Sequence, residues 1–219
     1  MASISHLVAV ALRSASELNA GVSSEWLKAS WFLGGLLPKS LLVSSVQDCG
    51  HLDMLLLCME NETASGLEKQ PDQTESLHYQ NLFSNLWVGS LYEVCRTVKE
   101  RALLEDPAFL DLAHDLRLVR IPLEKYEIAA DKHLPLVVEM QRQPQSANET
   151  DAYEYQRKDR AGKSHIMPTG LTLRGSITWQ VIDTEAENSR WIERRELSER
   201  FRSILGRLSQ LAPVPSSPE

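Results

Sequence analysis

Residues 77–131 constrain the fold most, because they encode consecutive helices with a start or stop signal at each junction. From residue 77 to residue 102, apolar residues recur at steps of three and four on more than one face, which is typical of a buried central helix. Asp106 can then cap a second helix that begins at Pro107 and has one apolar face. Pro122 is expected to end that helix and to open a third, short one. The stretch therefore predicts three central helices.

The residues before this stretch also predict helices. A helix is expected up to Asn19, a second one follows a serine cap, and Pro38 divides the second from what comes next. Residues 52–59 form a short apolar run that fits a helix or a strand, and its helical neighbours favour a helix. Residues 47–76 contain seven acidic residues and one lysine, a charge of −6. We expect residues 1–131 to form a helical domain with a solvated acidic loop at about 60–76.

After residue 131 the pattern changes from helix to strand. A short strand is expected at 134–140, a mobile polar loop at about 141–165, and a hairpin over 171–194 with a bend at Gly175. An amphipathic helix over 196–211 and a disordered tail at 212–219 follow. The fold class is therefore mainly α (α+β). It is a multi-helix bundle with a small C-terminal antiparallel hairpin or three-stranded sheet, followed by a helix, in a second unit at 132–211.

Composition narrows the class of protein. The net charge of −7 argues against a general nucleic-acid coat. The three cysteines form no CxxC pair and are odd in number, which favours a reducing cytosol. The N-terminus lacks the features of a signal peptide, and no run of 18 apolar residues predicts a membrane span. We therefore expect a soluble cytoplasmic protein that does not enter a membrane.

Few motifs point to catalysis. There is no GxSxG or HExxH motif, and the sequence around Lys163 lacks the first glycine of a P-loop because Arg157 stands at that position. His114 and Asp115 suggest an acid–base pair. Because they fall between apolar helix positions, we expect them to face solvent.

One constellation suggests metal-dependent chemistry. Asp131 precedes an apolar run that ends in Glu139-Met140-Gln141, and alternate residues of a strand share one face. This arrangement resembles a degenerate core motif of the PD-(D/E)xK nuclease family over about a dozen residues. The resemblance implies that Asp131 and Glu139 would hold Mg²⁺, while Gln141 would assist the attacking water. No other cofactor is expected.

The C-terminal part suggests a binding surface. Trp and Arg are enriched at binding hot spots, so the hairpin and last helix predict a docking site. The residues expected to form it are Trp179, Trp191, Arg190, Arg194 and Arg195. Interleaved glutamates favour pairing with these arginines along the helix over nucleic-acid binding.

The leading interpretation is a non-catalytic cytosolic accessory protein that binds another protein. The nuclease is the alternative, and a nucleic-acid-binding adaptor that uses the C-terminal arginines is third. The sequence does not define the partner, the biological process or the oligomeric state.

Overall fold

The computed structural model describes residues 3–66, 73–141 and 152–211, which form six α-helices and five β-strands. The helices are α1 (Ile4–Leu18), α2 (Ala20–Leu36), α3 (Leu42–Ser65), α4 (Gln73–Glu100), α5 (Pro107–Lys125) and α6 (Arg194–Leu211). The strands are β1 (Val137–Gln141), β2 (Ala152–Gln156), β3 (Thr169–Leu171), β4 (Ile177–Asp183) and β5 (Asn188–Glu193). The mainly α fold, with a small antiparallel sheet followed by a helix, is confirmed.

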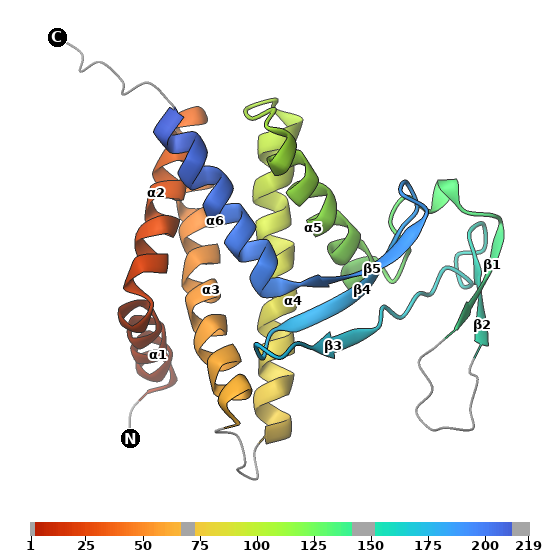
Figure 1. The fold of residues 1–219 in the computed structure, drawn as a ribbon, viewed down its shortest axis with the longest axis horizontal. Coiled ribbons are helices and arrows are strands. Elements are labelled where there is room, and N and C mark those ends of the chain that lie inside the picture. Colours follow the sequence, from red (N-terminus) through yellow and green to blue (C-terminus); the bar gives the residue numbers. More distant parts are fainter. Residues whose placement is uncertain (1–2, 67–72, 142–151, 212–219) are drawn as a thin grey trace.

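The helices form a bundle that α6 completes from the far end of the chain. In Figure 1, α3, α4 and α5 stand side by side, and α6 runs obliquely in front of α3 and α4, between α2 and α5. Helix α6 packs on α2 and α5, while β4 packs on α5. One hydrophobic cluster includes Trp26 of α2, Trp87 of α4, Trp179 of β4 and Phe201 of α6. The core therefore contains side chains from both sides of the predicted domain boundary at residue 131.

Local signals set the bounds of α5. The carboxylate of Asp106 accepts a hydrogen bond from the backbone N–H of Phe109 at 3.1 Å, and Pro107 occupies the first turn, as predicted. The expected break at Pro122 is wrong, because α5 continues to Lys125. Pro122 lies in the last turn, where it removes only its own donated bond. Its carbonyl accepts from the N–H of Tyr126, which ends the helix in the left-handed region.

Helix α3 is longer than the sequence predicted. The segment between residues 52 and 59 is helical, and the helix continues to Ser65, where Gly66 ends it at φ 63°. The acidic loop was expected to begin at about residue 60, but Glu60 lies inside α3 and is fully buried. Residues 67–72 of that loop lie outside the described residues.

The strands form two separate sheets. Strands β3, β4 and β5 make an antiparallel sheet, and a turn with Gly175 at φ 74° separates β3 from β4. The strand expected at 134–140 exists as β1, but it pairs with β2 instead of joining the hairpin. Strand β2 lies within the segment expected to be a loop, and residues 142–151 of that segment are outside the described residues. The predicted tail at 212–219 is outside them as well.

Candidate functional site

A buried ion cluster joins α6 to α3. Arg194 is fully buried at the start of α6, and its guanidinium donates to Asp53 at 2.5 Å and to Glu60 at 2.6 and 2.8 Å. The guanidinium also lies over the ring of Trp87, with its central carbon 5.2 Å from the ring centroid. Burial lowers the pKa of Arg194, but the two carboxylates raise it by more, so the side chain stays charged.

The two carboxylates of this cluster have further donors. The indole N–H of Trp26 donates to Asp53 at 2.8 Å, and the hydroxyl of Ser198 donates to the same oxygen at 2.7 Å. The hydroxyl of Ser176 donates to Glu60 at 2.8 Å. These hydrogen bonds offset part of the cost of burying charge, and they fix α2, α3, α6 and the turn before β4 relative to one another.

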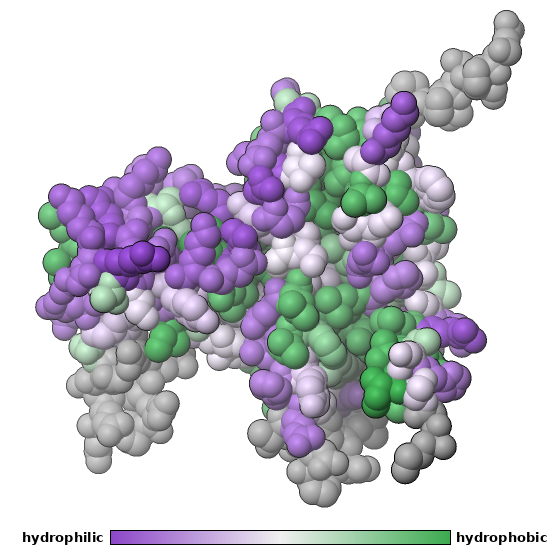
Figure 2. All heavy atoms as spheres, turned by 180° about the vertical axis from the view of Figure 1, so that it is seen from behind, coloured by the Kyte–Doolittle hydropathy of each residue, from purple (hydrophilic) through white to green (hydrophobic). Residues whose placement is uncertain are grey.

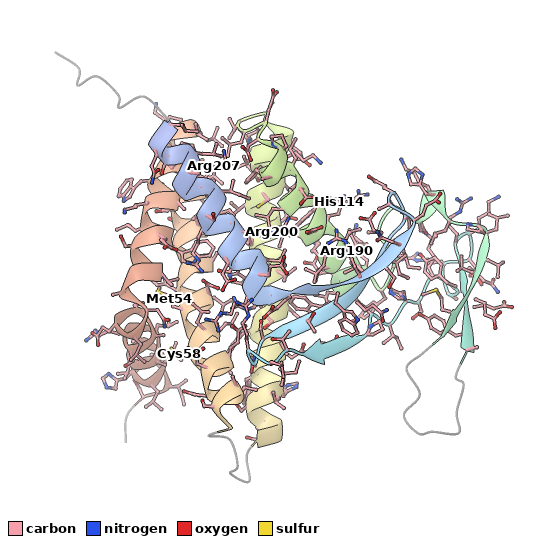
Figure 3. The ribbon with its side chains drawn as sticks, viewed as in Figure 1. Met54, Cys58, His114, Arg190, Arg200 and Arg207 are labelled. Carbon is pink, nitrogen blue, oxygen red and sulfur yellow. The ribbon has the colours of Figure 1, made fainter. Side chains whose placement is uncertain are left out.

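A second ion cluster joins α6 and β5 to α5. The carboxylate of Asp115, which is buried, accepts from Arg190 of β5 and from Arg200 of α6, the latter at 2.5 Å. Arg200 also binds Asp111 at 2.8 Å. Figure 3 shows Arg190, Arg200 and His114 where β5, α6 and α5 meet. The sheet and the last helix are thus both fixed to α5 by one carboxylate.

The expectation that His114 and Asp115 face solvent is wrong for Asp115, which is 1% exposed. Helix α5 is covered by α4 on one side and by α6 and β4 on another. Asp115 is therefore buried as well, although it is not part of the apolar face of the helix. His114 is partly exposed, and its Nε2 lies 3.0 Å from the carboxylate of Asp183 at the end of β4.

All six arginines between residues 190 and 207 have a carboxylate within 4 Å. They are Arg190, Arg194, Arg195, Arg200, Arg202 and Arg207. Only Arg195 pairs with a glutamate one turn further along α6, at 3.4 Å. The pairing expected along the helix is therefore mostly replaced by pairing with other elements, and the arginines form no uncompensated basic patch.

The predicted docking residues do not share one surface. Trp179 and Arg194 are fully buried, so neither can contact a partner in this conformation. Trp191 is 45% exposed on the outer face of the sheet, where it lies close to Gly170 of β3. The side chains of Arg190 and Arg195 are partly exposed and hold carboxylates of their own chain.

The residues of the predicted nuclease site also lie in separate settings. Asp131 begins a short 3₁₀ helix (Asp131–His133), and its Oδ2 accepts from the hydroxyl of Tyr155 at 3.0 Å. The ammonium of Lys163 lies 2.8 Å from the same oxygen. This carboxylate is therefore already engaged by two donors of its own chain.

Glu139 lies on β1 with an exposed side chain, directly opposite Glu154 of β2, in a sheet of two strands. Gln141 is the last residue of β1, and its side chain lies outside the described residues. Within the described parts of the chain, no group of three or more His, Cys, Asp or Glu residues could hold a metal ion. The nuclease with its Mg²⁺ site stays a prediction that no contact in the structure favours.

A groove along α4 lies outside these clusters, and we call it the α4 groove. It has a volume of about 730 Å³, with α4 as its floor and the ends of α3 and α5 as its walls. Its lining residues are Leu42, Ser45, Asp48, Leu82, Asn85, Leu86, Gly89, Ser90, Glu93, Val94, Thr97, Leu123 and Glu124. Seen from behind, the helical part shows hydrophobic areas between polar ones, whereas the β-containing part is mostly hydrophilic (Figure 2).

The α4 groove exposes apolar side chains that the sequence predicted to be buried. Leu82 and Leu86 are 42% and 54% exposed, although α4 is apolar on more than one face. The signal was present in the sequence, because α4 has more apolar positions than its packing against α3 and α5 uses. Which face remains open was not predictable without the positions of those two helices.

Comparisons with protein families, with curated proteins and with solved structures found no significant match to this chain. Among the helices that the structure describes, none is both long and apolar enough to cross a membrane.

Proposed function

We propose that this chain is a non-catalytic accessory protein that binds another protein through the α4 groove. The observation that carries the proposal is the exposure of Leu82 and Leu86 in a groove of about 730 Å³. Single exposed leucines are ordinary, but neighbouring ones at helical spacing in a concave surface are typical of an interaction site. They lie one turn apart on the same face of α4.

The state of the C-terminal arginines supports the same proposal. A nucleic-acid-binding adaptor requires basic side chains that are free to neutralise phosphates. Here the arginines between residues 190 and 207 hold carboxylates of α2, α3, α5 and α6. Their role is to fix α6 and the sheet to the bundle, so they do not favour the nucleic-acid-binding alternative.

We place this activity in the cytoplasm. The three cysteines, Cys49, Cys58 and Cys95, are all free thiols, which is the ordinary state in a reducing compartment. Two of them are buried and behave as small apolar side chains of the bundle.

Site-specific photo-crosslinking tests the proposal. A benzophenone amino acid is placed at Leu86 in the groove and, as a matched control, at Leu27, a leucine of α2 with 47% exposure. Each crosslinked protein is identified, purified and titrated with the wild type, with Leu86→Asp and with Leu27→Asp. We expect a partner that crosslinks from position 86 and binds Leu86→Asp at least tenfold more weakly. A partner that crosslinks equally from both positions, or binds both variants equally, would overturn the proposal.

A further inference from the structure

We infer that the α4 groove takes a cationic amphipathic helix of about four turns, an inference that rests on the proposed function. Four features of the groove support it: its length, the absence of a sheet edge along it, its apolar floor and the charge of its walls. Each limits the chemistry of the segment that fits.

Length and shape favour a helix. The lining residues on α4 run from Leu82 to Thr97, which corresponds to about 22 Å at 1.5 Å per residue. Every element that lines the groove is helical, so no strand edge offers backbone hydrogen bonds to an extended peptide. A helix satisfies its own backbone groups and can bind such a surface through side chains alone.

The floor of the groove is apolar toward its Leu82 end. Leu82 and Leu86 provide the apolar contacts, and Val94 lies buried further along. Gly89 lies under the Glu124 side chain, whose Oε1 is 2.9 Å from where a Cβ of residue 89 would stand. A partner helix with aliphatic residues at i, i+3 or i+4, and i+7 would cover both leucines and place its polar flank beside Glu124.

The walls of the groove carry negative charge. Asp48, Glu93 and Glu124 line it, and no lysine, arginine or histidine does. Arg120 lies 2.6 Å from Glu124 and 3.7 Å from Glu93, and Arg96 lies 2.7 Å from Glu93, so these two arginines neutralise part of this charge. Asp48 has no ion pair within the described residues. Lysine or arginine residues flanking the apolar face of the partner would complement these walls.

Fluorescence anisotropy with three designed 18-residue peptides tests the inference. The first is an amphipathic helix of leucine and lysine, the second replaces each lysine with glutamate, and the third scrambles the first so that its composition stays and its apolar face is lost. The full chain is titrated with each peptide at low and high salt, as are Leu86→Asp and the matched control Leu27→Asp. Circular dichroism confirms that both variants fold.

We expect the cationic amphipathic peptide to bind at least tenfold more tightly than either other peptide, and more weakly as salt rises. Leu86→Asp should weaken it at least tenfold, although the variant adds a negative charge that attracts lysine. Leu27→Asp adds the same charge elsewhere and should leave the affinity within twofold.

Equal binding of the scrambled or the anionic peptide would overturn the inference. If position 86 still crosslinks a partner, the proposed function stands and only the chemistry of the helix is wrong. If position 86 crosslinks nothing and Leu86→Asp binds the peptides like the wild type, both fall. A dimer of the free chain that Leu86→Asp dissociates would make a second copy the occupant, which also overturns the inference.

Discussion

Replacing Arg194 with methionine should destabilise the protein more than any other single change to its charged residues. The guanidinium is fully buried and pairs with Asp53 and Glu60 at 2.5 and 2.6 Å. Methionine has a similar volume, so the variant leaves no large cavity, but it leaves two buried carboxylates without their shared cation. Arg202 remains, with its Nε at 3.9 Å from Asp53. Removing one partner of a buried pair costs about 3–5 kcal/mol, so we expect a loss of about 4 kcal/mol.

A triple variant serves as the control, because it removes all three charges at once: Arg194→Met, Asp53→Asn and Glu60→Gln. The amide oxygens can still accept from Trp26, Ser198 and Ser176 and no unpaired charge stays buried, so the triple variant should recover to within about 2 kcal/mol of the wild type. Urea denaturation followed by tryptophan fluorescence measures each free energy of unfolding. A loss below about 1 kcal/mol for Arg194→Met, or a triple variant no more stable than the single one, would refute this reasoning.

Three further predictions concern other residues. Burial lowers the pKa of His165 to about 4 in the folded protein. As the pH falls below 6.5, the unfolded state therefore binds a proton that the folded state does not, and about 3 kcal/mol of stability should be lost by pH 4. His165→Gln should show less of this loss in denaturation curves at pH 7 and pH 4. Gly175→Ala should lower the free energy of unfolding by more than about 2 kcal/mol, because φ is 74° and the added methyl would overlap the backbone of Glu60. Gly206→Ala is the control: it lies in open space on α6 and should raise the free energy of unfolding by about 0.5–1 kcal/mol. Titration with a thiol reagent at pH 8 should modify only Cys58 in the folded protein and all three cysteines in urea. Cys49 and Cys95 should not react in the folded protein, because both are buried and burial raises the pKa of their thiols.

Local signals in the sequence predicted much of the helical framework. The Asp106-Pro107 start of α5 and the separation of α2 from α3 around Pro38 are where the sequence placed them. The bend at Gly175 is also present, because a positive φ strongly favours glycine. These features depend on a few neighbouring residues, so a single sequence contains the information.

The ion clusters were missed because their partners are far apart in the chain. Arg194 and Asp53 are 141 residues apart, and the glutamates adjacent to the arginines suggested a local alternative. A signal did exist in α3, where Asp53 and Glu60 are seven residues apart on the same face as Val46 and Cys49. Two acids on an apolar helix face require buried cations.

The candidate site was predictable only in part. The excess of apolar residues on α4 was visible, but it indicated a fully buried helix, and the docking site was expected around Trp179 and Trp191 instead. Which face of α4 stays open depends on where α3 begins, at Leu42, on where α5 ends, at Lys125, and on how both helices pack. Those are properties of the assembled bundle and not of any segment.

Methyl NMR spectra of the protein titrated with the cationic amphipathic peptide test the central claim most directly, because they locate the bound surface. We predict that the methyl signals of Leu82, Leu86 and Leu123 shift on binding, while those of Leu27 and Leu171, which lie outside the groove, do not. Shifts centred on Leu171 and the sheet, or no shift in the groove at saturating peptide, would contradict the assignment of the α4 groove as the binding site.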